Sequence, residues 1–120
     1  MITPDLYRQL MANLASGVTV VTTRDSKGQP YGLTVSAFTS VSLDPVLVLV
    51  CLDNRLSGLQ NFKNSKHFGV SILSEQQEDI SRAFAKKDSD RPSSLYIDGK
   101  LIPLIKNSLA VLECEVVNVF

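Results

Sequence analysis

The sequence has little of what metal sites and membrane spans require. It contains one histidine, His67, and no cluster of histidine with carboxylates, which argues against a metal site. No apolar run approaches the roughly 18 residues that a membrane-spanning helix needs. The first residues, MITPDLYRQL, contain no long apolar run and do not form a secretory signal. We therefore predict neither a bound metal nor a membrane partner.

An excess of charge is also missing. The 12 Lys and Arg residues balance the 12 Asp and Glu residues, so the formal net charge is zero. Nucleic-acid binding needs a basic patch or stripe, which this balance and its scattered charges do not provide. The one charged run, 85–91 (AKKDSDR), has mixed sign and is typical of a solvated loop. We predict no nucleic-acid partner.

Cysteine is scarce. Cys51 and Cys114 both lie inside apolar runs rather than in a C-x-x-C motif or a disulfide framework. This placement predicts two buried, reduced thiols in a cytoplasmic protein. The length of 120 residues fits a single domain, residues 1–120.

Hydrophobic periodicity predicts a mainly antiparallel β-barrel or sandwich with a few short helices. The run 46–52 (VLVLVCL) is continuously apolar, which favours a central strand buried on both faces. The other predicted strands are 18–23, 31–43, 67–73, a short one near 96–100, and 109–120. The predicted helices run from the N-cap Thr3 to about Ala15, from Asp53 or Asn54 past Phe62, and from the capping box Ser74/Gln77 to about Lys87.

The predicted last strand, 109–120, ends at the chain terminus on an apolar residue. Natural sheets avoid leaving such an edge exposed. We expect either that a partner chain pairs with this strand or that the chain is part of a longer domain.

The segment 31–45 (YGLTVSAFTSVSLDP) is dense in hydroxyls and almost uncharged. Written as one straight strand, it has two faces, because side chains alternate with period two. Two interpretations stay open: the polar face lines a site for a flat, phosphorylated ligand, or it is the solvent side of an ordinary strand. The apolar face holds Leu33, Val35, Ala37, Val41 and Leu43; the polar face holds Thr34, Ser36, Ser40 and Ser42, with Phe38 among them.

An ordered series of segments resembles the flavin reductase-like family of FMN-binding split barrels. The series begins with 17–23 (GVTVVTT), 32–45 (GLTVSAFTSVSLDP) and 46–52. It continues with 68–73 (FGVSIL), 82–85 (RAFA), 103–105 (PLI) and 110–114 (AVLEC). The resemblance implies a Greek-key split β-barrel that forms a homodimer, with a flavin near the subunit interface. It also implies reduction of FMN or FAD by NADH or NADPH, in many members for a partner monooxygenase.

The same resemblance implies which residues border the flavin. Ser57 is expected in the first turn of the short helix as a phosphate contact, with an ordinary helix-start residue as the alternative. Phe84 is expected either to cover the flavin or to belong to the core, and Cys51 to contact the flavin through its backbone. The implied set is Thr34, Val35, Ser36, Ser40, Cys51, Leu52, Asp53, Ser57 and Phe84.

Members of the family usually continue past the last strand with a Gly-Asp-His turn and a further strand, which the resemblance places near the nicotinamide. We expect this chain to lack that C-terminal part. An FMN-binding electron carrier of the same fold, or a dimerising protein that binds no flavin, therefore remains an alternative. The related pyridoxamine phosphate oxidases typically use a basic phosphate-binding strand, whereas residues 34–42 contain no Arg or Lys.

Overall fold

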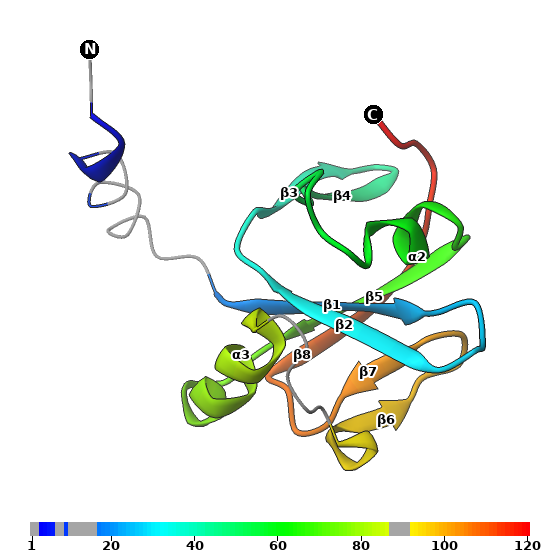
Figure 1. The fold of residues 1–120 in the computed structure, drawn as a ribbon. Helices are drawn as coiled ribbons and strands as arrows, with labels where there is room; N and C mark the ends of the chain where they lie inside the picture. Colours follow the sequence, from blue (N-terminus) through cyan, green and yellow to red (C-terminus); the bar gives the residue numbers. More distant parts are fainter. Residues whose placement is uncertain (1–2, 7–8, 10–16, 87–91) are drawn as a thin grey trace.

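The computed structural model describes residues 3–6, 9, 17–86 and 92–120. It is mainly antiparallel β-structure with a few short helices, as predicted, and Figure 1 shows the arrangement. A four-stranded sheet occupies the centre, in the order β2 (Pro30–Val35), β1 (Thr19–Arg24), β5 (His67–Ile72) and β8 (Ala110–Glu115). Two further two-stranded sheets pair β3 (Phe38–Leu43) with β4 (Val46–Val50) and β6 (Tyr96–Asp98) with β7 (Pro103–Ile105). In the described part of the chain these three sheets are separate, an arrangement that fits a split barrel.

Strand β1 (Thr19–Arg24) is the central strand of the fold. It pairs antiparallel with β2 (Pro30–Val35) and with β5 (His67–Ile72). Its three buried threonines donate hydrogen bonds to carbonyl oxygens: Thr19 to Val35 at 2.6 Å, Thr22 to Pro103 at 2.5 Å and Thr23 to His67 at 3.3 Å. Because each hydroxyl has a partner, this β-branched run is buried without an unsatisfied polar group.

Alternation along β1 separates two groups of core residues. Val20 packs with Leu73, Phe84 and Ile105, on the side covered by α3 (Glu78–Ala85). Val21 packs with a second group, formed by Leu33 and Val35 together with the partly buried Tyr31, Val50, Leu52, Leu56, Phe62 and Phe68. The second group lies beneath the candidate site described below.

The segment 31–45 does not form one straight strand. Strand β2 ends at Val35, and β3 (Phe38–Leu43) begins a separate hairpin, after the Phe38 N–H donates to the Ser36 carbonyl at 3.0 Å. A register shift between Ser40 and Ser42 breaks the alternation again. The predicted two-faced strand is therefore wrong beyond Val35, because the chain leaves the central sheet at residues 36–37.

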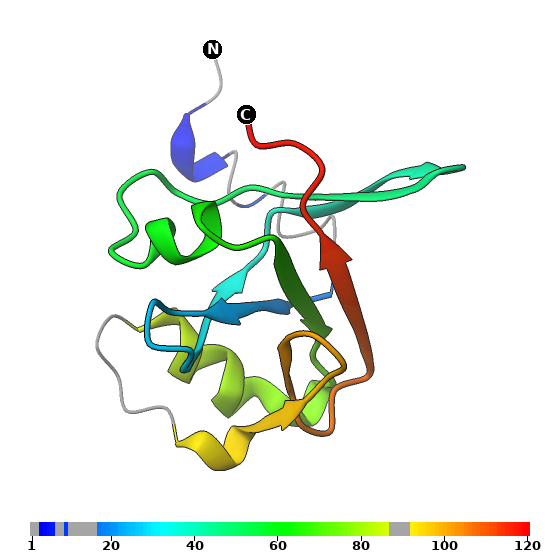
Figure 2. The same cartoon turned by 90° about the vertical axis from the view of Figure 1, so that its right-hand side faces the viewer.

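The apolar run 46–52 is not a central strand. Strand β4 (Val46–Val50) pairs with β3 in a two-stranded sheet, and Val46 at its start is 76% exposed. Figure 2 shows this β3–β4 hairpin extending away from the body of the molecule. The apolar side chains of β4, predicted to be buried on both faces, are instead exposed or half-buried.

Two of the predicted helix starts are confirmed in the described residues and one is wrong. The Leu6 N–H bonds the Thr3 hydroxyl at 3.2 Å, although residues 10–16 of the predicted helix lie outside the described residues. The capping box of Ser74 and Gln77 is present and begins η1 (Glu75–Gln77), which leads into α3. Helix α2 (Leu59–Lys63) has Gly58 as N-cap, so the prediction of Asp53 or Asn54 at that position is wrong.

The C-terminal third closes one side of the central sheet. A 3₁₀ turn (Ser93–Leu95) leads into β6 (Tyr96–Asp98), which pairs with β7 (Pro103–Ile105). Strand β8 (Ala110–Glu115) pairs with β5 at the edge of the sheet and is shorter than the predicted strand to residue 120. The described residues contain no helix that is long and apolar enough to cross a membrane.

Candidate functional site

A cavity of about 200 Å³ lies where β2 leaves the central sheet and β4 ends. Its floor includes the buried side chains of Leu33 and Val35. Ser36 and Asp53 are among the exposed residues at its rim. The lining residues are Leu33, Thr34, Val35, Ser36, Ala37, Cys51, Leu52, Asp53 and Leu56.

Two predicted clusters of site residues meet in this cavity. Residues 34–36 come from the end of β2, and residues 51–53 follow β4. The Cys51 N–H donates to the Ala37 carbonyl at 2.9 Å, which ties the end of the β3–β4 hairpin to the break after β2. Residues some 15 positions apart in the sequence are thus held around one hollow.

The polar groups of the cavity are not equally available to a ligand. The Thr34 hydroxyl donates to the Ser81 carbonyl on α3 at 2.6 Å, and the Cys51 N–H is already bonded to Ala37. The Ser36 hydroxyl has no partner among the residues that the structure describes. Ser36 is therefore the side-chain hydroxyl best placed to bond a ligand here.

Asp53 supplies the charge at the rim. Its Oδ1 accepts the backbone N–H of Arg55 at 2.8 Å and Arg55 Nε at 3.1 Å, and its Oδ2 accepts Arg55 Nη2 at 2.8 Å. These hydrogen bonds lower the pKa of Asp53 to about 2 and raise the pKa of Arg55. Asp53 is therefore ionised at neutral pH and held in a fixed pair with a cation.

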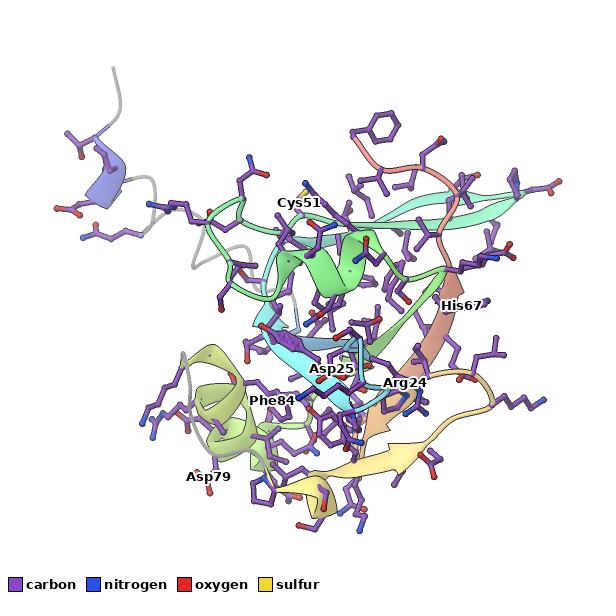
Figure 3. All side chains as sticks on the ribbon, turned by 45° about the vertical axis from the view of Figure 1, so that its right-hand side comes forward. Arg24, Asp25, Cys51, His67, Asp79 and Phe84 are labelled. Atoms are coloured by element: carbon purple, nitrogen blue, oxygen red, sulfur yellow. The ribbon has the colours of Figure 1, made fainter. Side chains whose placement is uncertain are left out.

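Three residues of the implied set lie outside this cavity. Ser40 is exposed on the β3–β4 hairpin, and Ser57 is exposed one residue before the N-cap of α2, not in its first turn. Phe84 belongs to α3, is 1% exposed in the core, and has its ring 5.7 Å from that of Tyr96. Figure 3 shows Phe84 on the side of α3 that faces the central sheet, and Cys51 on the opposite side of that sheet. A side chain so buried offers no face to a ligand, so Phe84 belongs to the core.

The prediction of two buried thiols is wrong for Cys51, which is exposed because β4 has ended before it; Cys114 on β8 is half-buried. Both cysteines are free, and burial raises the pKa of the Cys114 thiol.

Sequence reasoning missed four residues of the site. Leu33, Ala37 and Leu56 line the cavity, and Arg55 holds Asp53. The available signal for Arg55 was its position two residues after Asp53, a spacing at which a side chain bonds its neighbour in a turn. For Leu33, Ala37 and Leu56, nothing in the sequence distinguishes an apolar residue of a cavity wall from an ordinary core residue.

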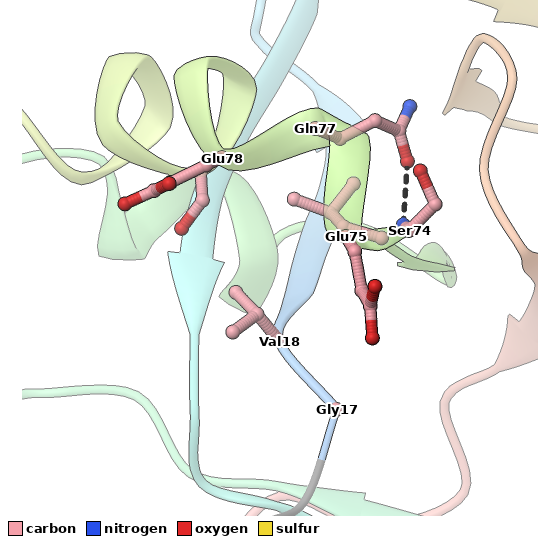
Figure 4. Close-up of a pocket in the computed structure, with 8 residues that line it drawn as sticks. Gly17, Val18, Ser74, Glu75, Gln77 and Glu78 are labelled. Carbon is pink, nitrogen blue, oxygen red and sulfur yellow. Dashed lines mark hydrogen bonds between the residues drawn. The ribbon is translucent and has the colours of Figure 1, made fainter.

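A second hollow, of about 370 Å³, lies beside Gly17 and the start of η1. Figure 4 shows the Ser74–Gln77 hydrogen bond, and it shows the side chains of Glu75 and Glu78, which line this hollow. Two carboxylates would repel a phosphorylated ligand. None of the implied flavin contacts lies there, so we take the smaller cavity as the candidate site.

The residues of the smaller cavity fit one side of a flavin. Leu33, Val35 and Leu52 offer apolar surface to a flat ring, while Ser36 and Asp53 offer polar groups at the edge. Ligand pockets usually hold roughly 300–1,000 Å³, so about 200 Å³ accommodates only part of a flavin. A further surface is needed to complete the site.

Comparison with known proteins also indicates a flavin site, because the relatives of this chain are named as flavin reductases or reductase components. The "Probable flavin reductase" of Rhizobium meliloti (strain 1021) is 37% identical over 97% of this chain and 38% of its own length. The reductase component of 4-nitrophenol 4-monooxygenase/4-nitrocatechol 2-monooxygenase from Rhodococcus opacus is 35% identical over 93% of this chain and 60% of its own. The chain thus spans less than two thirds of the length of either relative.

A solved structure also superposes closely. The NADH:FAD oxidoreductase of Streptomyces globisporus C-1027, in complex with NAD and FAD fragments, has a TM-score of 0.83 and 34% identity, covering 100% of this chain and 75% of that one. Residues 11–120 match the family described as "Flavin reductase like domain". The chain belongs to the flavin reductase-like domain family.

Proposed function

We propose that the protein is a flavin reductase that transfers hydride from NADH or NADPH to FMN, with FAD as the alternative flavin. The observation that carries the proposal is the meeting of residues 34–36 and 51–53 around one cavity in a chain of this family. We further propose that it supplies reduced flavin to a partner monooxygenase, since a relative of this chain is the reductase component of such a system.

For hydride transfer to a flavin, the protein mainly has to position the two rings and exclude water from them. When bound, a flavin accepts the hydride on its own ring, so the protein needs no acid or nucleophile. Leu33 and Val35 would pack against the ring and keep water from that side. The Ser36 hydroxyl would bond a polar atom at its edge and so help to fix its orientation.

We also propose that the protein works as a homodimer, with a second copy completing the site. Two observations support this: the cavity is small for a flavin, and the neighbouring β3–β4 hairpin exposes apolar side chains. Leu43 is 88% exposed, and Val41, Val46 and Leu49 are exposed on the same hairpin. Leu43 and Val46 are paired on adjacent strands, and exposed apolar side chains clustered in this way mark an interaction site. A cytoplasmic location remains part of the proposal, on the ground of the two free cysteines.

Rapid mixing tests the activity. Purified protein is mixed with FMN and NADH without oxygen, and the visible absorbance of the flavin is followed. Bleaching much faster than in buffer is expected. Quenching of FMN fluorescence without faster bleaching would instead identify an FMN carrier, and the absence of both would refute flavin binding altogether.

Light scattering tests the dimer. Leu43→Lys should convert the dimer to a monomer and weaken FMN binding, because a charge would enter an apolar contact. Leu101→Lys is the matched control, since Leu101 is also exposed but lies between β6 and β7. A monomeric wild type, or equal effects of the two substitutions, would contradict the proposed dimer surface.

A further inference from the structure

The charge at the rim of the cavity poses a problem for a phosphorylated ligand. Of the nine described residues that line the cavity, Asp53 is the charged one, and its charge is negative. A lone carboxylate at this position would repel a phosphate. The cation that faces Asp53 therefore decides what the rim can bind.

Arg55 approaches Asp53 with one edge of its guanidinium. Nε donates to Oδ1 at 3.1 Å and Nη2 donates to Oδ2 at 2.8 Å, so the pair is bidentate. The backbone N–H of Arg55 also donates to Oδ1 at 2.8 Å, which fixes the carboxylate in the turn. The guanidinium thereby balances the negative charge of Asp53, and the carboxylate holds the guanidinium in one orientation.

The other edge of the guanidinium remains available. A guanidinium has five N–H donors in a planar fork, and this pair uses two of them. In the part of the chain that the structure describes, Nη1 has no partner, and the Arg55 side chain is 90% exposed. The edge formed by Nη1 and the second Nη2 hydrogen matches a phosphate, which accepts two parallel hydrogen bonds.

We propose that Arg55 binds the phosphate of the flavin nucleotide and that Asp53 is the positioning residue that aims it. This inference rests on the proposed function, because it takes the cavity to be the flavin site. It assigns a role in specificity: the pair distinguishes FMN from riboflavin, which has the same ring and ribityl chain but no phosphate.

Binding affinity, measured by quenching of flavin fluorescence, tests the proposal without reference to activity. Wild type should bind FMN more tightly than riboflavin. Arg55→Met should weaken FMN binding by about tenfold, the typical loss of a charge-assisted hydrogen bond, and leave riboflavin binding within about twofold of wild type. Lys63→Met is the matched control, because Lys63 is an exposed cation in the last turn of the nearby α2; it should change neither affinity.

A second pair of variants separates direct contact from neutralisation of charge. In Arg55→Met the Asp53 carboxylate is left unpaired and repels phosphate, which enlarges the effect. The comparison of Asp53→Asn with Asp53→Asn/Arg55→Met removes that repulsion. If Arg55 binds the phosphate, its removal should still lower the preference for FMN several-fold in the Asp53→Asn background.

Each result has a definite meaning. An unchanged preference for FMN in the Arg55→Met variant, or in the double variant relative to Asp53→Asn, overturns the phosphate contact while the flavin site stands. Wild type that binds both flavins equally also overturns it. Wild type that binds neither flavin refutes the proposed function and this inference with it.

Discussion

Gly58→Ala tests how the fold supports the candidate site. Gly58 is buried at the N-cap of α2, two residues after the cavity residue Leu56. A Cβ at this position would overlap the Oη, Cζ and Cε1 atoms of Tyr31. The Tyr31 ring packs edge-on against Phe62, with 5.9 Å between ring centroids, so it has no free space on that side. The methyl group must displace either the ring or the loop.

The size of the effect follows from two opposing terms. Overpacking a well-packed region typically costs about 1–3 kcal/mol. Replacing Gly by Ala stabilises by about 0.4–1 kcal/mol through the unfolded chain, and this gain is available because Gly58 has φ −94°. We expect a net loss of about 1–2 kcal/mol in the free energy of unfolding, or roughly 3–10 °C in Tm for a chain of this length.

A double-mutant cycle with Tyr31→Ala identifies the cause. Without the ring, the added methyl group meets no obstacle, so Gly58→Ala should become neutral or slightly stabilising in that background. Urea unfolding of the four proteins should give a coupling energy of about 1–3 kcal/mol. An equal penalty for Gly58→Ala with and without the Tyr31 ring would refute the reasoning. Gly58→Ala should also weaken FMN binding, because the displaced loop carries Leu56.

Three further variants concern the core residue Phe84, the cavity residue Ser36 and the exposed Glu113 on β8. Phe84→Ala should lower the free energy of unfolding by about 3–5 kcal/mol because the ring is buried, yet leave FMN affinity unchanged below the transition; a loss under about 1 kcal/mol in urea titration would contradict its core role. Ser36→Ala should weaken FMN binding by about 1 kcal/mol, whereas Ser40→Ala, outside the cavity, should not; equal effects in a fluorescence titration would argue against the assigned boundary. Backbone N–H groups of residues 100–102 bond the Glu113 carboxylate and lower its pKa from the ordinary 4.5, so this stabilisation is complete above pH 4.5 and is lost as the pH falls further. The Tm of wild type should therefore fall more steeply below that pH than the Tm of Glu113→Gln, and parallel curves would refute the assignment.

Local rules explain why much of the fold was predictable. The β-branched run in β1 and the capping box of Ser74 and Gln77 depend on neighbours in the sequence, so these elements form where the pattern places them. The run 46–52 shows the limit of such rules. Hydrophobicity predicts that the apolar side chains of a strand will be buried. It does not show whether they are buried in the chain's own core or against another surface.

The candidate site was only partly readable for the same reason. Residues 34–36 and 51–53 were placed near a flavin by resemblance, and the structure brings both groups to one cavity. Ser40 and Ser57 share the residue types of the site but lie outside the cavity, because a hydroxyl in a sequence carries no information on the direction it faces. The Asp53–Arg55 pair was not predicted from the sequence at all.

The residue pattern was enough to predict strand β1 and the capping box of Ser74 and Gln77, since these follow from the preferences of short segments. It also determined membership of the flavin reductase-like family, through the order of its segments. Only the tertiary structure decided that the chain leaves the sheet after Val35, that the Thr34 hydroxyl faces α3 and that Arg55 turns back onto Asp53. Those outcomes depend on contacts between segments far apart in the chain and on the geometry of single turns, and neither is visible in a pattern of residue types.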